Sequence, residues 1–133
     1  MKMIAALLPL ALLSACASDQ PSLQTERTYR VEWLGERPLI DSSYLTVTLG
    51  EEGRAYGNAG CNHWFGGYSL NDEQLSFSAP ASTMKMCPPA LMEQEQRFLK
   101  TLQSVQRWDF SATGELRLWP ASGKPIRLFE DQR

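Results

Sequence analysis

Apolar and polar residues alternate along several short segments of this 133-residue chain, and this alternation limits its fold more than any other feature. Along residues 28–33, for example, Tyr29, Val31 and Trp33 alternate with polar side chains. Such alternation places the apolar side chains on one face of a strand. The same pattern predicts six more strands, near residues 45–49, 65–70, 74–78, 108–110, 116–118 and 126–128. A glycine-rich hairpin turn at residues 50–53 predicts a returning strand over residues 54–57.

A helical period replaces this alternation after Pro88 and Pro89, which suit the first turn of a helix because its N–H groups have no intrahelical partner. One face of the predicted helix carries Leu91, Glu95, Phe98, Leu102 and Val105. We expect an amphipathic helix of about four turns. Two pairs of acidic residues are predicted to be solvated rather than catalytic, in a turn and on the helix: Glu51/Glu52 and Glu93/Glu95.

Together these elements predict a single α+β domain over residues 28–131. The expected architecture is a curved antiparallel sheet of about eight strands, five before the helix and three after it, forming a half-open, barrel-like fold packed on one α-helix. Short connections favour antiparallel neighbours, since parallel strands need long crossovers. Residues 35–43 and 79–83 are predicted to be irregular.

The N-terminus has the pattern of a bacterial lipoprotein signal peptide over residues 1–15. Lys2 precedes an uncharged, mostly apolar run that is shorter than the roughly 20 residues needed to span a bilayer. The run ends in Leu13-Ser14-Ala15-Cys16, which matches a lipobox with cleavage between Ala15 and Cys16 and lipid attached to the Cys16 thiol. A plain secretory signal that happens to end in cysteine is the alternative.

Residues 16–27 would then form the lipidated cysteine and a flexible tether, because they contain few large apolar side chains. Ala17 occupies the position where an aspartate would retain a lipoprotein at the inner membrane of enteric-type bacteria. We therefore expect a lipid-anchored protein of the outer membrane that faces the periplasm.

Charge argues against nucleic acid as a partner. Of the 13 basic residues, Lys2 is lost with the signal peptide, while all 15 acidic residues remain, so the mature chain is weakly acidic. The chain has no cluster of Lys and Arg that would attract a phosphate backbone.

Residues 57–68 combine four glycines, two asparagines and the only histidine, His63, around Cys61. Gly and Asn enter left-handed backbone conformations readily, so a sharp turn is expected before an aromatic strand. With Cys16 lipidated, Cys61 and Cys87 remain, in an oxidising compartment. We expect a disulfide or a packed thiol pair, and a disulfide closing this loop would stabilise the fold by about 3–4 kcal/mol.

Two chemical alternatives use the same residues. A soft-metal site suited to Cu(I) would recruit Cys61, His63, Cys87, Met84 and Met86, although Cys-x-His lacks the paired spacing of a zinc motif. Cys61 and His63 lie two residues apart, which on an extended segment permits a nucleophile–base pair, but no orienting acid is evident. We expect no catalytic residue, metal or cofactor.

The ordered motifs resemble the META domain, the family that includes the HslJ-like heat-shock lipoproteins of bacteria. The resemblance spans about residues 29–129 and is carried by Gly60, Cys61, Asn62, Gly67, Tyr68, Thr83, Met86 and Cys87. A helical Met92-Glu93-x-Glu95 pattern follows them. Lys85 stands where the family is expected to have methionine, and His63 is not part of the motif. The resemblance implies a role in envelope stress without a settled enzyme activity, and a fold similar to that of pilotin lipoproteins.

Three functions follow as expectations. The first is a non-enzymatic outer-membrane lipoprotein that supports envelope stress tolerance by binding an unidentified envelope protein. The second is a module that binds a small hydrophobic ligand or lipid, which requires that large side chains do not fill the concave face of the sheet. A redox protein or enzyme is third. Four tryptophans are expected in the core and at its rim rather than in a ligand cage: Trp33, Trp64, Trp108 and Trp119.

Overall fold

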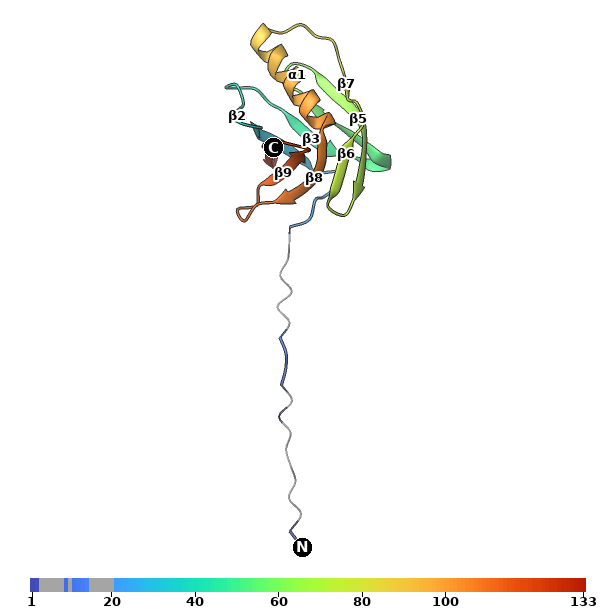
Figure 1. Ribbon diagram of the computed structural model, residues 1–133, viewed down its shortest axis with the longest axis vertical. Coiled ribbons are helices and arrows are strands. Elements are labelled where there is room, and N and C mark those ends of the chain that lie inside the picture. Colours follow the sequence, from blue (N-terminus) through green and yellow to red (C-terminus); the bar gives the residue numbers. More distant parts are fainter. Residues whose placement is uncertain (3–8, 10, 15–20) are drawn as a thin grey trace.

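Eight antiparallel strands close into a barrel that a single helix covers (Figure 1). The structure is a computed structural model that describes residues 1–2, 9, 11–14 and 21–133. The predicted cleavage and lipidation site at Ala15 and Cys16 therefore lies outside the described residues. Within those residues, no helix combines the length and the apolar character needed to cross a bilayer.

The strands of the barrel follow the predicted segments closely. They are β1 (Thr28–Leu34), β3 (Thr46–Leu49), β4 (Arg54–Asn58), β5 (His63–Asn71), β6 (Gln74–Phe77), β8 (Val105–Phe110), β9 (Leu116–Pro120) and β10 (Ile126–Glu130). Two further strands of two residues each lie in segments predicted to be irregular, namely β2 (Arg37–Pro38) and β7 (Ala81–Ser82). They pair with β1 and β5, and such short pairings leave no alternating pattern in the sequence.

Pairing between the first and last strands of the domain closes the barrel. β1 and β10 are antiparallel from Tyr29↔Glu130 to Leu34↔Ile126, with a bulge between Val31 and Trp33. The half-open barrel of the sequence prediction is thus closed. The seam between β6 and β8 is weaker, because these strands share the single register pair Gln74↔Arg107.

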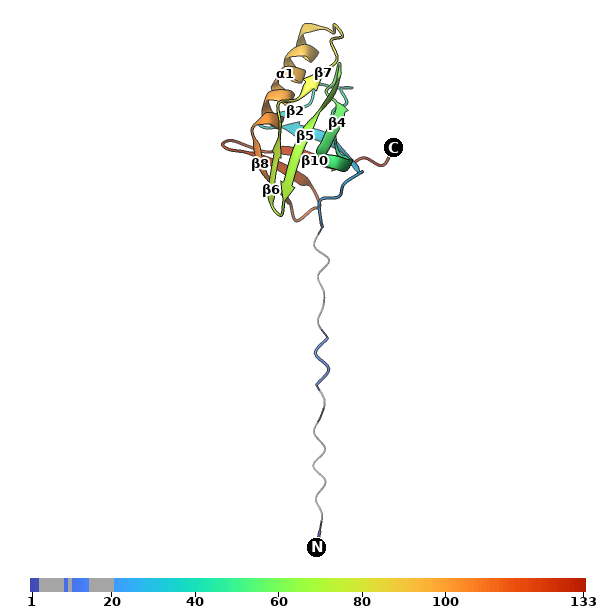
Figure 2. The ribbon, with the colours of Figure 1, turned by 90° about the vertical axis from the view of Figure 1, so that its right-hand side faces the viewer.

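The helix α1 (Pro89–Gln103) lies against the barrel (Figures 1 and 2). Aromatic side chains make part of this contact. The ring of Trp64 lies edge-on to those of Phe98 and Phe77, with centroids 6.2 and 6.1 Å apart. All three side chains belong to one buried core with the inward residues of the strands. The concave face is therefore filled by large side chains, which counts against a ligand inside the barrel.

Two sequence predictions about the helix are wrong. Val105 is not on the helical face but begins β8, since α1 ends at Gln103 and Ser104 caps it. Glu95 is not solvated, because only 1% of it is exposed. Helical spacing does place Glu95 on the apolar face, and a buried polar partner makes its burial there tolerable.

The chain contacts the barrel before the predicted domain start at residue 28. Leu23 packs against the core, and the N–H of Glu26 donates to the carbonyl oxygen of Leu49 at 2.8 Å. Both ribbon views show this segment leaving the barrel at the end away from the start of α1 (Figures 1 and 2).

Candidate functional site

A disulfide joins the two cysteines that the sequence analysis paired. Cys61 lies in the loop after β4 and Cys87 just before α1, and their Cα atoms are 6.0 Å apart. Because both sulfur atoms are in this bond, neither is a thiolate in this structure. The soft-metal ligand set and the Cys61–His63 nucleophile both require a free thiolate.

Next to the disulfide, Asn62 connects three segments of the chain. Its N–H and its side-chain NH₂ donate to the two carboxylate oxygens of Glu95, at 2.7 and 2.9 Å. Its side-chain oxygen accepts from the N–H of Lys85 at 2.7 Å and from the hydroxyl of Thr83 at 3.0 Å. The asparagine therefore ties the glycine-rich loop both to α1 and to the strand-to-helix connection.

Two glycines allow this loop to form. A side chain at Gly57 would place a Cβ atom 2.1 Å from the carbonyl oxygen of Thr46, so the two backbones approach too closely for any other residue. Gly60 has φ +104°, a conformation that other residues rarely adopt. The indole N–H of Trp64 donates to the same Thr46 oxygen at 2.9 Å, which anchors the start of β5.

The connection between β7 and α1 displays two methionines on the surface. Met84 and Met86 are each 89% exposed, whereas Asn62 holds Thr83 before them and Lys85 between them, and the disulfide holds Cys87 after them. Methionine is flexible and polarizable, and it is frequent on protein surfaces that bind partners. We call residues 83–87 the methionine loop.

A second exposed apolar group lies beside this loop. Tyr56 and Phe65, which are directly opposite each other on β4 and β5, are 45% and 52% exposed. Phe65 also pairs with Ala81 of β7, and the N–H of Thr83 donates to the carbonyl of His63, so the methionine loop continues from this part of the sheet. Within residues 21–133, exposed large hydrophobic side chains are Ile40 and these four, Tyr56, Phe65, Met84 and Met86.

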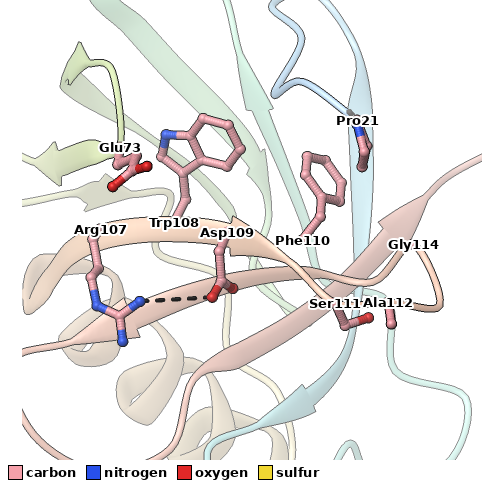
Figure 3. A pocket seen from close by; sticks show the side chains of 9 residues that line it. All are labelled: Pro21, Glu73, Arg107, Trp108, Asp109, Phe110, Ser111, Ala112 and Gly114. Atoms are coloured by element: carbon pink, nitrogen blue, oxygen red, sulfur yellow. Dashed lines mark ion pairs between the residues drawn. The ribbon is translucent and has the colours of Figure 1, made fainter. Parts of the chain in front are cut away.

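A hollow of about 680 Å³ lies near the segment that enters the barrel (Figure 3). Trp108 and Phe110 point into it together, with ring centroids 5.8 Å apart, and Pro21 faces them. The indole N–H of Trp108 donates to the carbonyl oxygen of Asp72 at 2.8 Å. Aromatic side chains therefore line one side of this hollow, while Arg107 and Asp109 lie on the other side of the same strand (Figure 3).

On that other side, Asp109 is the centre of a charged cluster. It accepts two hydrogen bonds from Arg117, at 2.7 and 2.8 Å, and one from the indole N–H of Trp119 at 2.9 Å. Partial burial acts to raise the pKa of Asp109, but these hydrogen bonds outweigh it and hold the pKa below the ordinary value of 3.8. The guanidinium of Arg107 stacks on Trp119, 4.5 Å from the ring centroid. Trp119 is thus a surface residue in an ion-pair cluster.

The other tryptophans divide as the sequence predicts. Trp64 is in the core, Trp108 packs against the core and is partly exposed, and Trp33 is partly exposed beneath the guanidinium of Arg127. Among the described residues no group of three or more His, Cys, Asp or Glu side chains is arranged to hold a metal ion. The sequence patterns did not predict that Glu95 accepts hydrogen bonds from Asn62, although the position of Glu95 on the apolar face of the helix indicated its burial.

The residues of this site coincide with a known family pattern. A model described as META domain matches residues 21–133. The chain belongs to the META domain family. Among the motif residues of this META domain, the structure joins Cys61 to Cys87 and places Asn62, Thr83 and Glu95 in one hydrogen-bonded cluster.

Two solved structures share the fold of this META domain. A protein from Burkholderia xenovorans, solved by NMR, is 22% identical with a TM-score of 0.69, over 82% of this chain and 84% of that one. Another protein solved by NMR is 23% identical with a TM-score of 0.60, over 77% and 86% of the two chains. At this identity the likeness concerns the fold alone. No curated protein matches.

Proposed function

We propose that this META domain protein is a lipid-anchored protein of the outer membrane that faces the periplasm. The observation that carries the proposal is how the three cysteines are used. Cys61 and Cys87 form a disulfide, the kind of bond that persists in oxidising compartments. The remaining cysteine, Cys16, is the one that ends the lipobox Leu13-Ser14-Ala15-Cys16.

We further propose that the protein acts without enzymatic chemistry, by binding a partner protein of the envelope under stress. The methionine loop supports this role, because its two exposed apolar side chains sit on a backbone held by Asn62 and the disulfide. A surface ordered before binding loses less conformational entropy when a partner docks. The exposed aromatic pair Tyr56 and Phe65 would extend the contact area.

The anchor is tested by expressing the full chain in a Gram-negative host and measuring its mass and its membrane fraction. Wild type should lack residues 1–15, carry the mass of the lipid and fractionate with the outer membrane. Cys16→Ser should lose the lipid, and Ala17→Asp should keep the lipid but move to the inner membrane. An exported protein with an unmodified Cys16 thiol would leave the plain secretory signal as the explanation.

The partner is tested by placing a photoreactive residue at position 84 or 86 and irradiating stressed cells. A specific crosslinked protein is expected from both positions and not from Thr113, an exposed residue of the turn between β8 and β9.

Deletion of the gene should increase sensitivity to heat or to envelope-active drugs. Wild type should restore resistance, and Met84→Ser/Met86→Ser should not. A deletion strain that resists all such stresses as wild type does would contradict this role.

A small hydrophobic ligand is the second candidate, and the hollow lined by Trp108 and Phe110 favours it (Figure 3). Because the barrel interior is filled, such a ligand would bind at the rim near Pro21. A native mass spectrum of protein purified from the periplasm, with Cys16 replaced, tests this. Retained mass that matches a lipid, and that Trp108→Ala abolishes, would favour the ligand. A bare chain two mass units light, as a disulfide requires, would favour the protein partner.

A further inference from the structure

Three cations that have no carboxylate partner within the described residues converge on one hollow of the surface. Among the described residues, ion pairs engage six arginines, namely Arg27, Arg30, Arg54, Arg107, Arg117 and Arg127. Arg37, Arg97 and Lys124 are in none of these pairs, and all three line a hollow of about 320 Å³. They come from β2, from α1 and from the connection between β9 and β10. The fold thus gathers cations from three distant parts of the chain.

Arg97 gives this hollow a second distinguishing feature. Its side-chain Nε is buried and, within the described part of the chain, has no hydrogen-bond acceptor. A buried donor without an acceptor costs free energy, and native proteins contain few of them. Arg97 lies outside the last turn of α1, where Lys100 is the basic residue, so the helix dipole does not account for this cation, and a dipole supplies no acceptor atom for its N–H group.

The chemistry of the lining points to an anion with several acceptor oxygens. An arginine presents a planar fork of N–H donors that matches a phosphate group, whereas a lysine acts on it as a point charge. Glu36 also lines the hollow, so the four charged side chains keep an excess of positive charge. The volume is at the lower end of the roughly 300–1,000 Å³ typical of small-molecule sites. It accommodates a phosphate group together with part of the molecule that bears it.

We propose that Arg37, Arg97 and Lys124 form a binding site for a phosphate group at the junction of β2, α1 and the β9–β10 connection. Arg97 contributes its partly buried guanidinium, and the exposed side chains of Arg37 and Lys124 supply the other two charges of the site. This site is separate from the methionine loop and from the hollow at Trp108. It stands independently of the lipid anchor.

Titration of the full chain with inorganic phosphate, followed by NMR of the backbone amides, tests the proposal. Saturable shifts should appear at residues of all three segments. Arg97→Gln should weaken binding by about tenfold or more, as expected for loss of a charge-assisted hydrogen bond. Lys100→Gln is the matched control, because Lys100 is an exposed cation of the same helix that does not line the hollow. It should leave the affinity unchanged.

Two sources of the phosphate group are distinguished by a second titration, with phosphatidylcholine vesicles that do or do not contain phosphatidylglycerol. Binding of free phosphate without preferential binding of the anionic vesicles indicates a soluble ligand. Preferential vesicle binding that Arg97→Gln abolishes indicates a lipid headgroup. If Arg97→Gln does not fold, Lys124→Gln replaces it. Absence of saturable binding in both titrations, or an equal loss with Lys100→Gln, would overturn the proposal.

Discussion

At the scale of single residues, Asn62 and Glu95 show how a short motif determines a tertiary contact. Asn62 lies in the loop after β4, and Glu95 lies in the second turn of α1, 33 residues further on. Each oxygen of the carboxylate accepts one N–H of the asparagine. The contact is buried, so a change that leaves one donor unpaired is costly.

Glu95→Gln is expected to lower the free energy of unfolding by about 1–3 kcal/mol. A glutamine keeps one acceptor oxygen, but its NH₂ group would face the N–H donor of Asn62 or of the Asn62 side chain. Urea unfolding followed by tryptophan fluorescence measures the effect. Glu93→Gln is the matched control on the exposed side of α1, and it should change stability by no more than about 0.5 kcal/mol. Equal effects of the two substitutions would contradict the structural role of the contact.

At the scale of elements, the disulfide and the Asn62 cluster act on the same two segments in different ways. The hydrogen bonds of Asn62 specify where the loop lies against α1. The disulfide closes a loop across a sequence separation of 26 and mainly restricts the unfolded chain. The geometry of the loop should therefore survive without the disulfide, at a lower stability.

Replacing both cysteines, Cys61→Ser/Cys87→Ser, is expected to cost about 3.5 kcal/mol of unfolding free energy in the chain-entropy description. The folded variant should keep the amide chemical shifts of Asn62 and Lys85, because their hydrogen bonds do not require the bridge. Dithiothreitol should destabilise wild type to a similar degree and leave the variant unaffected. If the fully reduced wild type were as stable as the oxidised wild type, the disulfide would not stabilise the fold.

The hairpin of β8 and β9 carries a pH-dependent contribution through Asp109. Its pKa is lower in the folded chain than the ordinary value of 3.8, since the bonds from Arg117 and Trp119 favour the carboxylate. The stabilisation is therefore present above 3.8 and is lost as the pH falls through the depressed value in the folded state. Asp109→Asn should be less stable than wild type near pH 7, and the difference should shrink as the pH falls below the ordinary value of 3.8.

Urea unfolding of both proteins across this pH range provides the measurement. Glu32→Gln, which removes an exposed carboxylate that pairs with Arg30 on β1, serves as the comparison and should show little pH-dependent difference. A stability difference between wild type and Asp109→Asn that stays constant with pH would rule out the titration of Asp109 as its cause.

At the scale of the whole molecule, the barrel has one strong closure and one weak seam. β1 and β10 are paired along their length, from Tyr29 to Leu34 on the first strand. β6 and β8 meet at one register pair, supplemented by the N–H of Trp108, which donates to the carbonyl oxygen of Glu73 at 3.1 Å. Local opening should therefore begin at the β6–β8 seam.

Hydrogen exchange under native conditions tests whether the β6–β8 seam opens more readily than the rest of the barrel. The amide of Trp108 bonds across the weak seam, whereas the amide of Val31 bonds to the carbonyl oxygen of Leu45 at 2.9 Å within the closed part of the sheet. Trp108 should exchange at least about tenfold faster than Val31, by local rather than global unfolding. Equal protection of the two amides would mean that the barrel opens only as a whole.

The sequence by itself determined the features that depend on neighbours along the chain. Alternation of polar and apolar residues, together with the glycine-rich turn at residues 50–53, located the eight strands of the barrel, and the helical period with Pro88 and Pro89 located α1. For the strands of the barrel, the order of five strands, one helix and three strands was correct for the same reason, whereas the short strands β2 and β7 were not predicted. The family motif and the pairing of Cys61 with Cys87 could also be predicted from the sequence.

Only the tertiary structure decided what depends on contacts between distant residues. Closure of the barrel requires β1 to pair with β10, and no local sequence pattern in either strand identifies the strand it pairs with. The burial of Glu95 depends on Asn62, and the start of β8 at Val105 depends on its pairing with Pro120. Side-chain periodicity reports which face of an element is apolar, whereas long-range pairing is decided by how all the elements pack together.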